Sequence, residues 1–303
     1  MLHAYLTALY DLAVKDRRVL SLIADSGTGY DLLFKRDLPD QFYDFGISEQ
    51  NMVAAAAGLA SEGYVPFAFA PGAFLAYRSH EFIRLDCCLQ KRNVKLIGMG
   101  SGVSWSTLGP THHTTEDIAC LRSLPGLTIF SPSTPAEAAE TVKAAYALEG
   151  PVYIRLGMTG EPELFRNQVN FRVGRNAVLR EGKDIAVFAT GSIVAEVLKA
   201  AERLEADGIS AAVHNVSSLK PFDAFDVLDC AKRYARIYTV EEHNVCGGLG
   251  DAVAAVLAGS GCTCPLTRIG LADVFASGYG TEHEVRAANG LDAESLAGRM
   301  RIS

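Results

Sequence analysis

The sequence predicts two α/β domains, each a three-layer α/β/α structure with a largely parallel central sheet. Short apolar segments alternate with segments of helical periodicity along most of the chain. The apolar segments lack regular polar alternation, which is typical of strands buried on both faces of a parallel sheet. The chain has 303 residues, 49% of them hydrophobic and 21% charged, so it can form two cores.

The first half alternates regularly between helix and strand. Apolar spacing predicts an initial helix over residues 2–14. Strands are expected at residues 19–24, 42–45, 65–70, 94–100, 127–130 and 152–155. Further helices are expected after Glu49, over the aromatic segment 74–88, and over residues 134–148.

The alternation weakens between residues 157 and 181, where charges and turn formers accumulate, with a short strand expected near Phe171. It then resumes with strands at 184–189, 211–215, 236–240 and 266–269, and helices at 192–207, 223–234 and 248–258. We therefore expect one domain over residues 1–165, a linker over 166–182 and a second domain over 183–303.

Composition excludes several classes of protein. The formal net charge of −7 argues against nucleic-acid binding, which needs clustered Lys and Arg. The seven cysteines are scattered, so neither a disulfide framework nor a metal site is predicted. No apolar run approaches the ~20 residues of a membrane span, and the opening residues do not resemble a signal peptide. A cytoplasmic protein without membrane or nucleic-acid partners is expected.

A polar cluster, Ser48-Glu49-Gln50-Asn51, directly precedes an alanine-rich run. Such a cluster is typical of a helix N-terminus, with Ser48 or a neighbour as the cap and Glu49 favoured by the helix dipole. The small residues behind it allow a flat ligand to approach closely, and a carboxylate there is costly to bury without use. Glu49 is therefore either part of a cap or a functional carboxylate.

Two adjacent histidines, His112 and His113, follow Leu108-Gly-Pro-Thr in a loop after a predicted strand. Open parallel sheets bind their ligands at such loops, and histidine can donate hydrogen bonds or move protons near neutral pH. In the alternative interpretation, Thr114 or Thr115 caps the next helix and the histidines are solvated.

Aromatic residues gather in segment 66–77, among them Phe69, Phe74 and Tyr77. These rings could stack on a flat heterocycle, or they could simply belong to the core.

Three arginines, Arg78, Arg84 and Arg155, could hold a phosphate, and Arg155 is the best placed because it ends a strand. The alternative is an ion pair with a nearby carboxylate. The Gly-rich segment 241–251 lacks phosphate-loop spacing, so a tight turn explains it better.

Four segments in order resemble the pyrimidine-binding and C-terminal domains of transketolase-like thiamine diphosphate enzymes. They are GISEQNMVAAAAGLA (46–60), GPTHH (109–113) followed by EDIACLRSLPGLTIFSPSTPAEA (116–138), GPVYIRLG (150–157) and VEEHNVCGGLGDAV (240–253). Together they extend over nearly the whole chain.

The family's GDG motif, which binds the diphosphate and its divalent ion, is absent from this sequence. The resemblance therefore implies a split enzyme, with a separate diphosphate-binding subunit and two copies of each chain. Thiamine diphosphate would lie between the subunits, and Mg²⁺ or Ca²⁺ would be bound mainly by the partner.

The resemblance also implies roles for single residues. Glu49 would hydrogen-bond N1′ of the cofactor's pyrimidine and so promote its activation. His112, with His113 beside it, would contact the substrate, and Arg155 its phosphate. Phe74, with Phe69 and Tyr77 less secure, would pack on the aminopyrimidine.

Two departures concern the substrate. Leu108 stands where many transketolases have Asp, and Gly100 or Ser101 where they have His. Without those polar partners, the site should no longer favour the usual sugar hydroxyls. We expect ketol transfer on an unusual sugar phosphate or a related polar substrate. The alternatives are the β-subunit of a 2-oxoacid dehydrogenase, a 1-deoxyxylulose-phosphate synthase-like decarboxylase, and an inactive regulatory partner.

Overall fold

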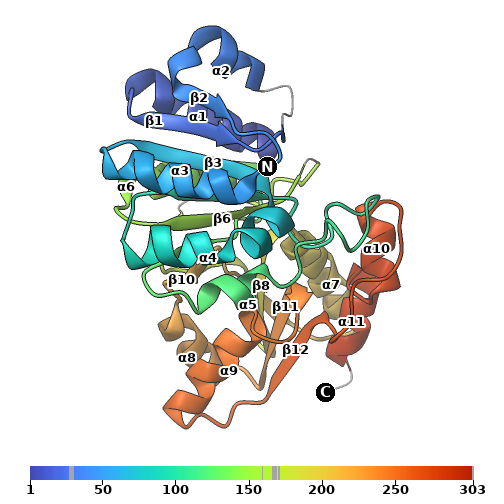
Figure 1. The fold of residues 1–303 in the computed structure, drawn as a ribbon. Coiled ribbons are helices and arrows are strands. Elements are labelled where there is room, and N and C mark those ends of the chain that lie inside the picture. The colour runs from blue at the N-terminus through green and yellow to red at the C-terminus, as the bar shows by residue number, and fades with distance from the viewer. Residues whose placement is uncertain (27–30, 159, 166–168, 170, 302–303) are drawn as a thin grey trace.

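Two largely parallel sheets, each covered by helices, make up the molecule (Figure 1). The computed structural model describes residues 1–26, 31–158, 160–165, 169 and 171–301. The expected three-layer α/β/α domains are confirmed. None of the helices in this described part combines the length and the apolar character that a membrane span requires.

The first sheet has seven strands in the order β10-β5-β6-β4-β3-β1-β2. All neighbouring strands are parallel except β10, which runs antiparallel to β5. The strands are β1 (Val19–Ile23), β2 (Phe42–Asp44), β3 (Val65–Pro71), β4 (Lys95–Met99), β5 (Thr128–Phe130), β6 (Val152–Leu156) and β10 (Ser218–Lys220).

Helices bury both faces of this sheet, as strand β1 illustrates. Leu20 and Leu22 belong to one core cluster, which includes apolar residues of α3 (Glu49–Ser61). Val19 and Ile23 belong to a second cluster on the other face, under α1 (Leu2–Lys15) and α6 (Pro135–Ala147). The parallel strands therefore need no polar alternation.

The second sheet has five strands in the order β12-β11-β8-β9-β7, with only β7 antiparallel to its neighbour. The strands are β7 (Ala177–Arg180), β8 (Ile185–Thr190), β9 (Ala211–Asn215), β11 (Arg236–Asn244) and β12 (Leu266–Leu271). Its helices are η4 (Gly191–Ile193), α7 (Val194–Ala206), α8 (Ala224–Arg233), α9 (Leu249–Ser260), α10 (Glu282–Ala288) and α11 (Ala293–Arg301).

The expected linker contains part of this second sheet. Strand β7 lies inside residues 166–182, and residues 166–168 and 170 of that range lie outside the described part. The strand expected near Phe171 is not formed by the residues described there, 169 and 171–176. Phe171 instead packs its ring edge-on against Phe130 of the first sheet, at 5.1 Å between centroids.

The expected continuous helix over residues 74–88 is interrupted. Two π-helical segments, η2 (Phe74–Arg78) and η3 (Ile83–Leu89), flank a short α-helix, α4 (His80–Phe82). Such π-helical turns are rare and occur frequently at functional sites. Helices α2 (Asp31–Asp37), η1 (Pro39–Gln41) and α5 (Asp117–Arg122) complete the first half.

Strand β10 joins the two halves of the molecule. Its residues follow β9 of the second sheet in the chain, yet Ser218 pairs with Phe130 at the edge of the first sheet. Lys220 also donates through Nζ to the carbonyl of Arg122 at 3.0 Å.

A buried arginine, Arg155, forms a second link between the halves through its hydrogen bond to Glu242. Arg155 of β6 donates through Nε to both carboxylate oxygens of Asp117, at 3.0 and 3.1 Å. Its Nη2 donates to the carbonyl oxygens of Thr114 and Glu242, both at 2.9 Å. Arg155 is 1% exposed, so its side chain is buried within this interface. This corrects the expectation that Arg155 reaches a substrate phosphate.

We predict that Arg155→Met lowers the free energy of unfolding by about 3–5 kcal/mol, because it leaves the Asp117 carboxylate buried without its cation. Urea denaturation followed by circular dichroism measures this loss. Replacing both partners, as in Arg155→Met with Asp117→Leu, should recover part of it. The exposed control Lys143→Met should change stability by less than about 0.5 kcal/mol. A single variant as stable as this control would contradict the prediction.

Candidate active site

A pocket of about 330 Å³ opens at the carboxyl edge of the first sheet. Its floor comes from the ends of neighbouring strands, with Ala24 after β1, Pro71 in β3 and Met99 in β4. In open parallel sheets, ligands bind at this edge because the strand-to-helix loops converge there. The remaining lining residues are Asp25, Ser26, Ile47, Glu49, Phe74, Trp105, Leu108 and His112.

Glu49 brings a buried carboxylate to this pocket from the first turn of α3, where the helix dipole favours a negative charge. The residue is 1% exposed. Ser48 occupies the N-cap position as expected, but its hydroxyl donates back to the carbonyl of Phe45 at 2.7 Å and does not cap α3. The predicted helix start at Ser48 is therefore confirmed, but the predicted hydrogen bond from a capping side chain to α3 is not formed.

Arg78 of η2 holds one oxygen of this carboxylate. Its Nη1 donates to Glu49 Oε2 at 2.7 Å, and its guanidinium carbon lies 4.6 Å from the centre of the Phe74 ring. The ion-pair interpretation of Arg78 is thus confirmed. Among the described residues, no donor reaches Glu49 Oε1, so this oxygen is left as an acceptor in the pocket.

His112 closes the pocket together with two aromatic rings. Its ring packs edge-on against Phe74 at 5.1 Å and against Trp105 at 6.2 Å between centroids. Thr111 Oγ1 lies 2.9 Å from His112 Nδ1, which leaves Nε2 as the nitrogen for a ligand.

Sequence reasoning missed Trp105, Asp25, Ser26 and Ile47 as pocket residues. Trp105 carried a usable signal, because it is the only tryptophan and lies in a Gly- and Ser-rich loop after a strand. Asp25 has φ of 50°, a left-handed conformation uncommon outside glycine, and its amide donates to Asp44 Oδ1 at 3.0 Å. Backbone strain of this kind is frequent at functional sites, but the sequence does not reveal it.

Of the other predicted residues, only some line the main pocket. Leu108 lines its mouth and is 46% exposed. Tyr77 and His113 line a neighbouring pocket of about 270 Å³, which shares Phe74 with the main pocket. Phe69 stacks on Tyr5 in the core at 5.6 Å and does not line the pocket.

His113 is buried with neither ring nitrogen hydrogen-bonded to a described residue. Burial lowers the pKa of His113, because the charged imidazolium is poorly solvated there. Tyr77 has a partner, since its hydroxyl donates to Glu116 Oε2 at 2.9 Å. The geometry therefore assigns His112, and not His113, to the main pocket.

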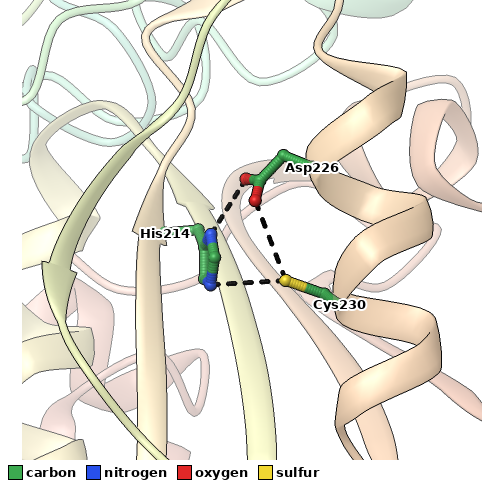
Figure 2. Close-up of side chains that lie close together, drawn as sticks. All are labelled: His214, Asp226 and Cys230. Carbon is green, nitrogen blue, oxygen red and sulfur yellow. Dashed lines mark hydrogen bonds and ion pairs between the residues drawn. The ribbon is translucent and has the colours of Figure 1, made fainter.

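A separate cluster links β9 to α8 in the second domain (Figure 2). His214 Nδ1 lies 2.9 Å from Asp226 Oδ2, and Cys230 Sγ lies 3.4 Å from His214 Nε2. These donor types can hold a metal ion. Without a metal ion, burial raises the pKa of the Cys230 thiol to about 12, so the thiol is protonated and can donate to His214 Nε2. We interpret the cluster as a structural hydrogen-bond chain.

The fold and the pocket define a class: a two-domain α/β protein with a small-molecule site built on a buried carboxylate and aromatic rings. Residues 1–159 match the family "Transketolase, pyrimidine binding domain", and residues 174–296 match "Transketolase, C-terminal domain".

Among curated relatives, the chain is 38% identical to one of the subunits of an apulose-4-phosphate transketolase from Actinobacillus succinogenes, over 92% of this chain and 90% of that protein. It is 36% identical to "6-deoxy-6-sulfo-D-fructose transketolase subunit SqwH" of a Clostridium species, over 96% and 90%. A solved structure, "Split gene transketolase, inactive beta4 tetramer", is 38% identical with a TM-score of 0.90, and the match covers 98% of this chain and 96% of that one.

The chain belongs to the transketolase family and carries its pyrimidine-binding and C-terminal domains.

We predict that His113→Phe keeps or raises the free energy of unfolding at pH 7, by up to about 1–3 kcal/mol, because it removes two buried polar atoms without partners. Below pH 7 the unfolded chain takes up a proton near the ordinary histidine pKa, while the buried ring resists it. The wild type should therefore lose more stability than this variant between pH 7 and pH 5. Urea denaturation at both pH values tests this. The exposed control His283→Phe should keep the wild-type pH dependence, and an equal dependence in His113→Phe would contradict the prediction.

Proposed function

We propose that this chain is the pyrimidine-binding subunit of a two-subunit, thiamine diphosphate-dependent transketolase. It would transfer a two-carbon ketol unit between sugar phosphates or related polar substrates. The observation that carries the proposal is the buried carboxylate of Glu49, which faces a pocket beside an aromatic ring at the carboxyl edge of the sheet.

The residues of the pocket fit the pyrimidine end of this cofactor. Glu49 Oε1 is an acceptor without a donor among the described residues, which suits a protonated ring nitrogen. Phe74 offers an aromatic ring, and Ile47 and Met99 supply apolar surface for a flat heterocycle. When bound, thiamine diphosphate supplies the carbon nucleophile that carries the ketol unit.

The residues of this chain would then bind and orient the cofactor's pyrimidine ring and the substrate. Glu49 holds the proton at pyrimidine N1′ through Oε1, a task that needs a carboxylate and not an amide. Phe74 fixes the plane of the pyrimidine ring. His112 presents Nε2 toward the reacting end of the substrate, because Nδ1 faces Thr111.

A separate subunit would complete the site. The chain has no GDG motif for the diphosphate, and two apolar side chains at the mouth of the pocket, Ile47 and Leu108, are 76% and 46% exposed. Exposed apolar residues around a site favour a protein partner. We propose two copies of each subunit, with Mg²⁺ or Ca²⁺ held mainly by the partner, in a cytoplasmic enzyme.

The residues that line the pocket favour an unusual sugar as the substrate. Leu108 and Trp105 line the pocket together with His112, and Leu108 stands at the sequence position where many transketolases have Asp. The relatives from Actinobacillus and Clostridium are both named for modified sugars, which agrees with a pocket that reads fewer hydroxyl groups. Donor and acceptor would differ from the common pentose phosphates.

We predict that Glu49→Gln, in the chain reconstituted with its diphosphate-binding partner, lowers kcat by about 10²–10⁴-fold, because the amide cannot hold the N1′ proton as an acid–base group. Ketol transfer from a ketose donor measures this loss. The matched control Glu62→Gln, an exposed position at the end of the same helix, should retain full activity. Unchanged activity of Glu49→Gln would instead indicate an inactive regulatory subunit.

The reaction type has a separate test. The reconstituted pair should consume a ketose donor without release of CO₂ and should release none from pyruvate. Isotope-labelled pyruvate with CO₂ trapping is a suitable measurement. CO₂ from pyruvate would favour a decarboxylase of the 1-deoxyxylulose-phosphate synthase or 2-oxoacid dehydrogenase type.

A further inference from the structure

Arg78 touches both residues that are proposed to hold the pyrimidine ring. Its Nη1 bonds Glu49 Oε2 at 2.7 Å, and its guanidinium lies over the Phe74 ring at 4.6 Å. Arg78 does not itself line the main pocket. Its contacts with the pocket are therefore made through Glu49 and Phe74, which both line it.

The hydrogen bond restricts how the Glu49 carboxylate can turn. A guanidinium is planar and donates in fixed directions, so the bond at Oε2 limits rotation of the carboxylate and leaves Oε1 for a ligand. Without this bond, the side chain could rotate within the pocket and Oε1 would lose its fixed position.

The cation–π contact restrains the second residue. A guanidinium over an aromatic face is attracted by the ring's electron density, which favours one orientation of Phe74. Because Phe74 and Arg78 begin and end the same π-helical segment, the geometry of that turn sets their spacing.

Burial differs between the two charged partners. The Glu49 side chain is 2% exposed, while that of Arg78 is 42% exposed. The carboxylate is thus the buried partner, and the cation stays partly exposed to solvent.

We propose that Arg78 is a positioning residue for the cofactor's pyrimidine ring: it locks the Glu49 carboxylate with Oε1 toward the ring and holds Phe74 in its stacking orientation. This inference rests on the proposed function. It assigns Arg78 a role in cofactor affinity as well as in rate.

The positioning role of residue 78 should require the planar guanidinium of arginine, and not a positive charge alone. Lysine keeps the charge near Glu49 but lacks the planar group that orients the carboxylate and stacks on Phe74. Arg78→Lys should therefore behave more like Arg78→Met than like the wild type. If the cation merely compensated a buried charge, Arg78→Lys would restore normal behaviour.

The experiment measures binding of thiamine diphosphate, with Mg²⁺ present, to the reconstituted pair by isothermal titration calorimetry. Arg78→Met and Arg78→Lys should each weaken binding by about 10-fold or more, equivalent to about 1.4 kcal/mol. The control is Arg84→Met, an exposed arginine on the adjacent π-helical segment, which should bind like the wild type. Near-ultraviolet circular dichroism of the bound cofactor should also change in both Arg78 variants.

A double-mutant cycle isolates the route through Glu49. In a Glu49→Gln background, Arg78→Met should cause a smaller further loss of cofactor affinity than it does in the wild type, because the carboxylate that it orients is gone. Additive losses would overturn the route through Glu49.

The outcomes separate this inference from the proposed function. If Glu49→Gln binds the cofactor normally and remains active, the cofactor site itself is wrong. If Glu49→Gln weakens binding but both Arg78 variants bind like Arg84→Met, only the role of Arg78 is overturned.

Discussion

Buried Arg155 is the residue through which the histidine loop, α5 and the second domain are held together. One guanidinium bonds a carboxylate at the start of α5, a carbonyl in the histidine loop and a carbonyl of β11. It therefore fixes the loop that carries His112 relative to the second domain. The buried guanidinium thus supports the loop of the candidate site from the side away from the pocket, through hydrogen bonds to both domains.

Much of the fold could be predicted because the strands of a buried parallel sheet are continuous apolar runs. Strands β1, β3 and β4, whose ends form the pocket floor, come close to this, with Ser21 in β1 and Lys95 at the start of β4 as the polar exceptions. The short strand β10 could not be predicted, because its three residues pair with a strand nearly ninety positions earlier in the chain. The breaks in segment 74–88 likewise have no local signal, since helical spacing alone does not distinguish α from π turns.

Some residues of the candidate site can likewise be predicted from local sequence, whereas others are brought together only by tertiary folding. Glu49 was detectable because a carboxylate before an alanine run is out of place, and His112 because it follows a strand in a loop. The ligand contact predicted for Arg155 was wrong. Its position at a strand end suggests such a contact, but its partner Asp117 is brought to it only by tertiary folding. Arg78 and Trp105 gain their meaning from neighbours far away in sequence, so residue type alone could not place them.

Strand β10 ties the sheet of the first domain to the second domain. Because the second domain supplies the edge strand of the first domain's sheet, removing it would expose β5 as an open edge, and such edges pair readily with other chains. The core cluster under α3 also continues into the second domain, through Phe188 and Val227. The two domains should therefore unfold as one cooperative unit, and a fragment cut at the linker is a poor substitute for the intact chain.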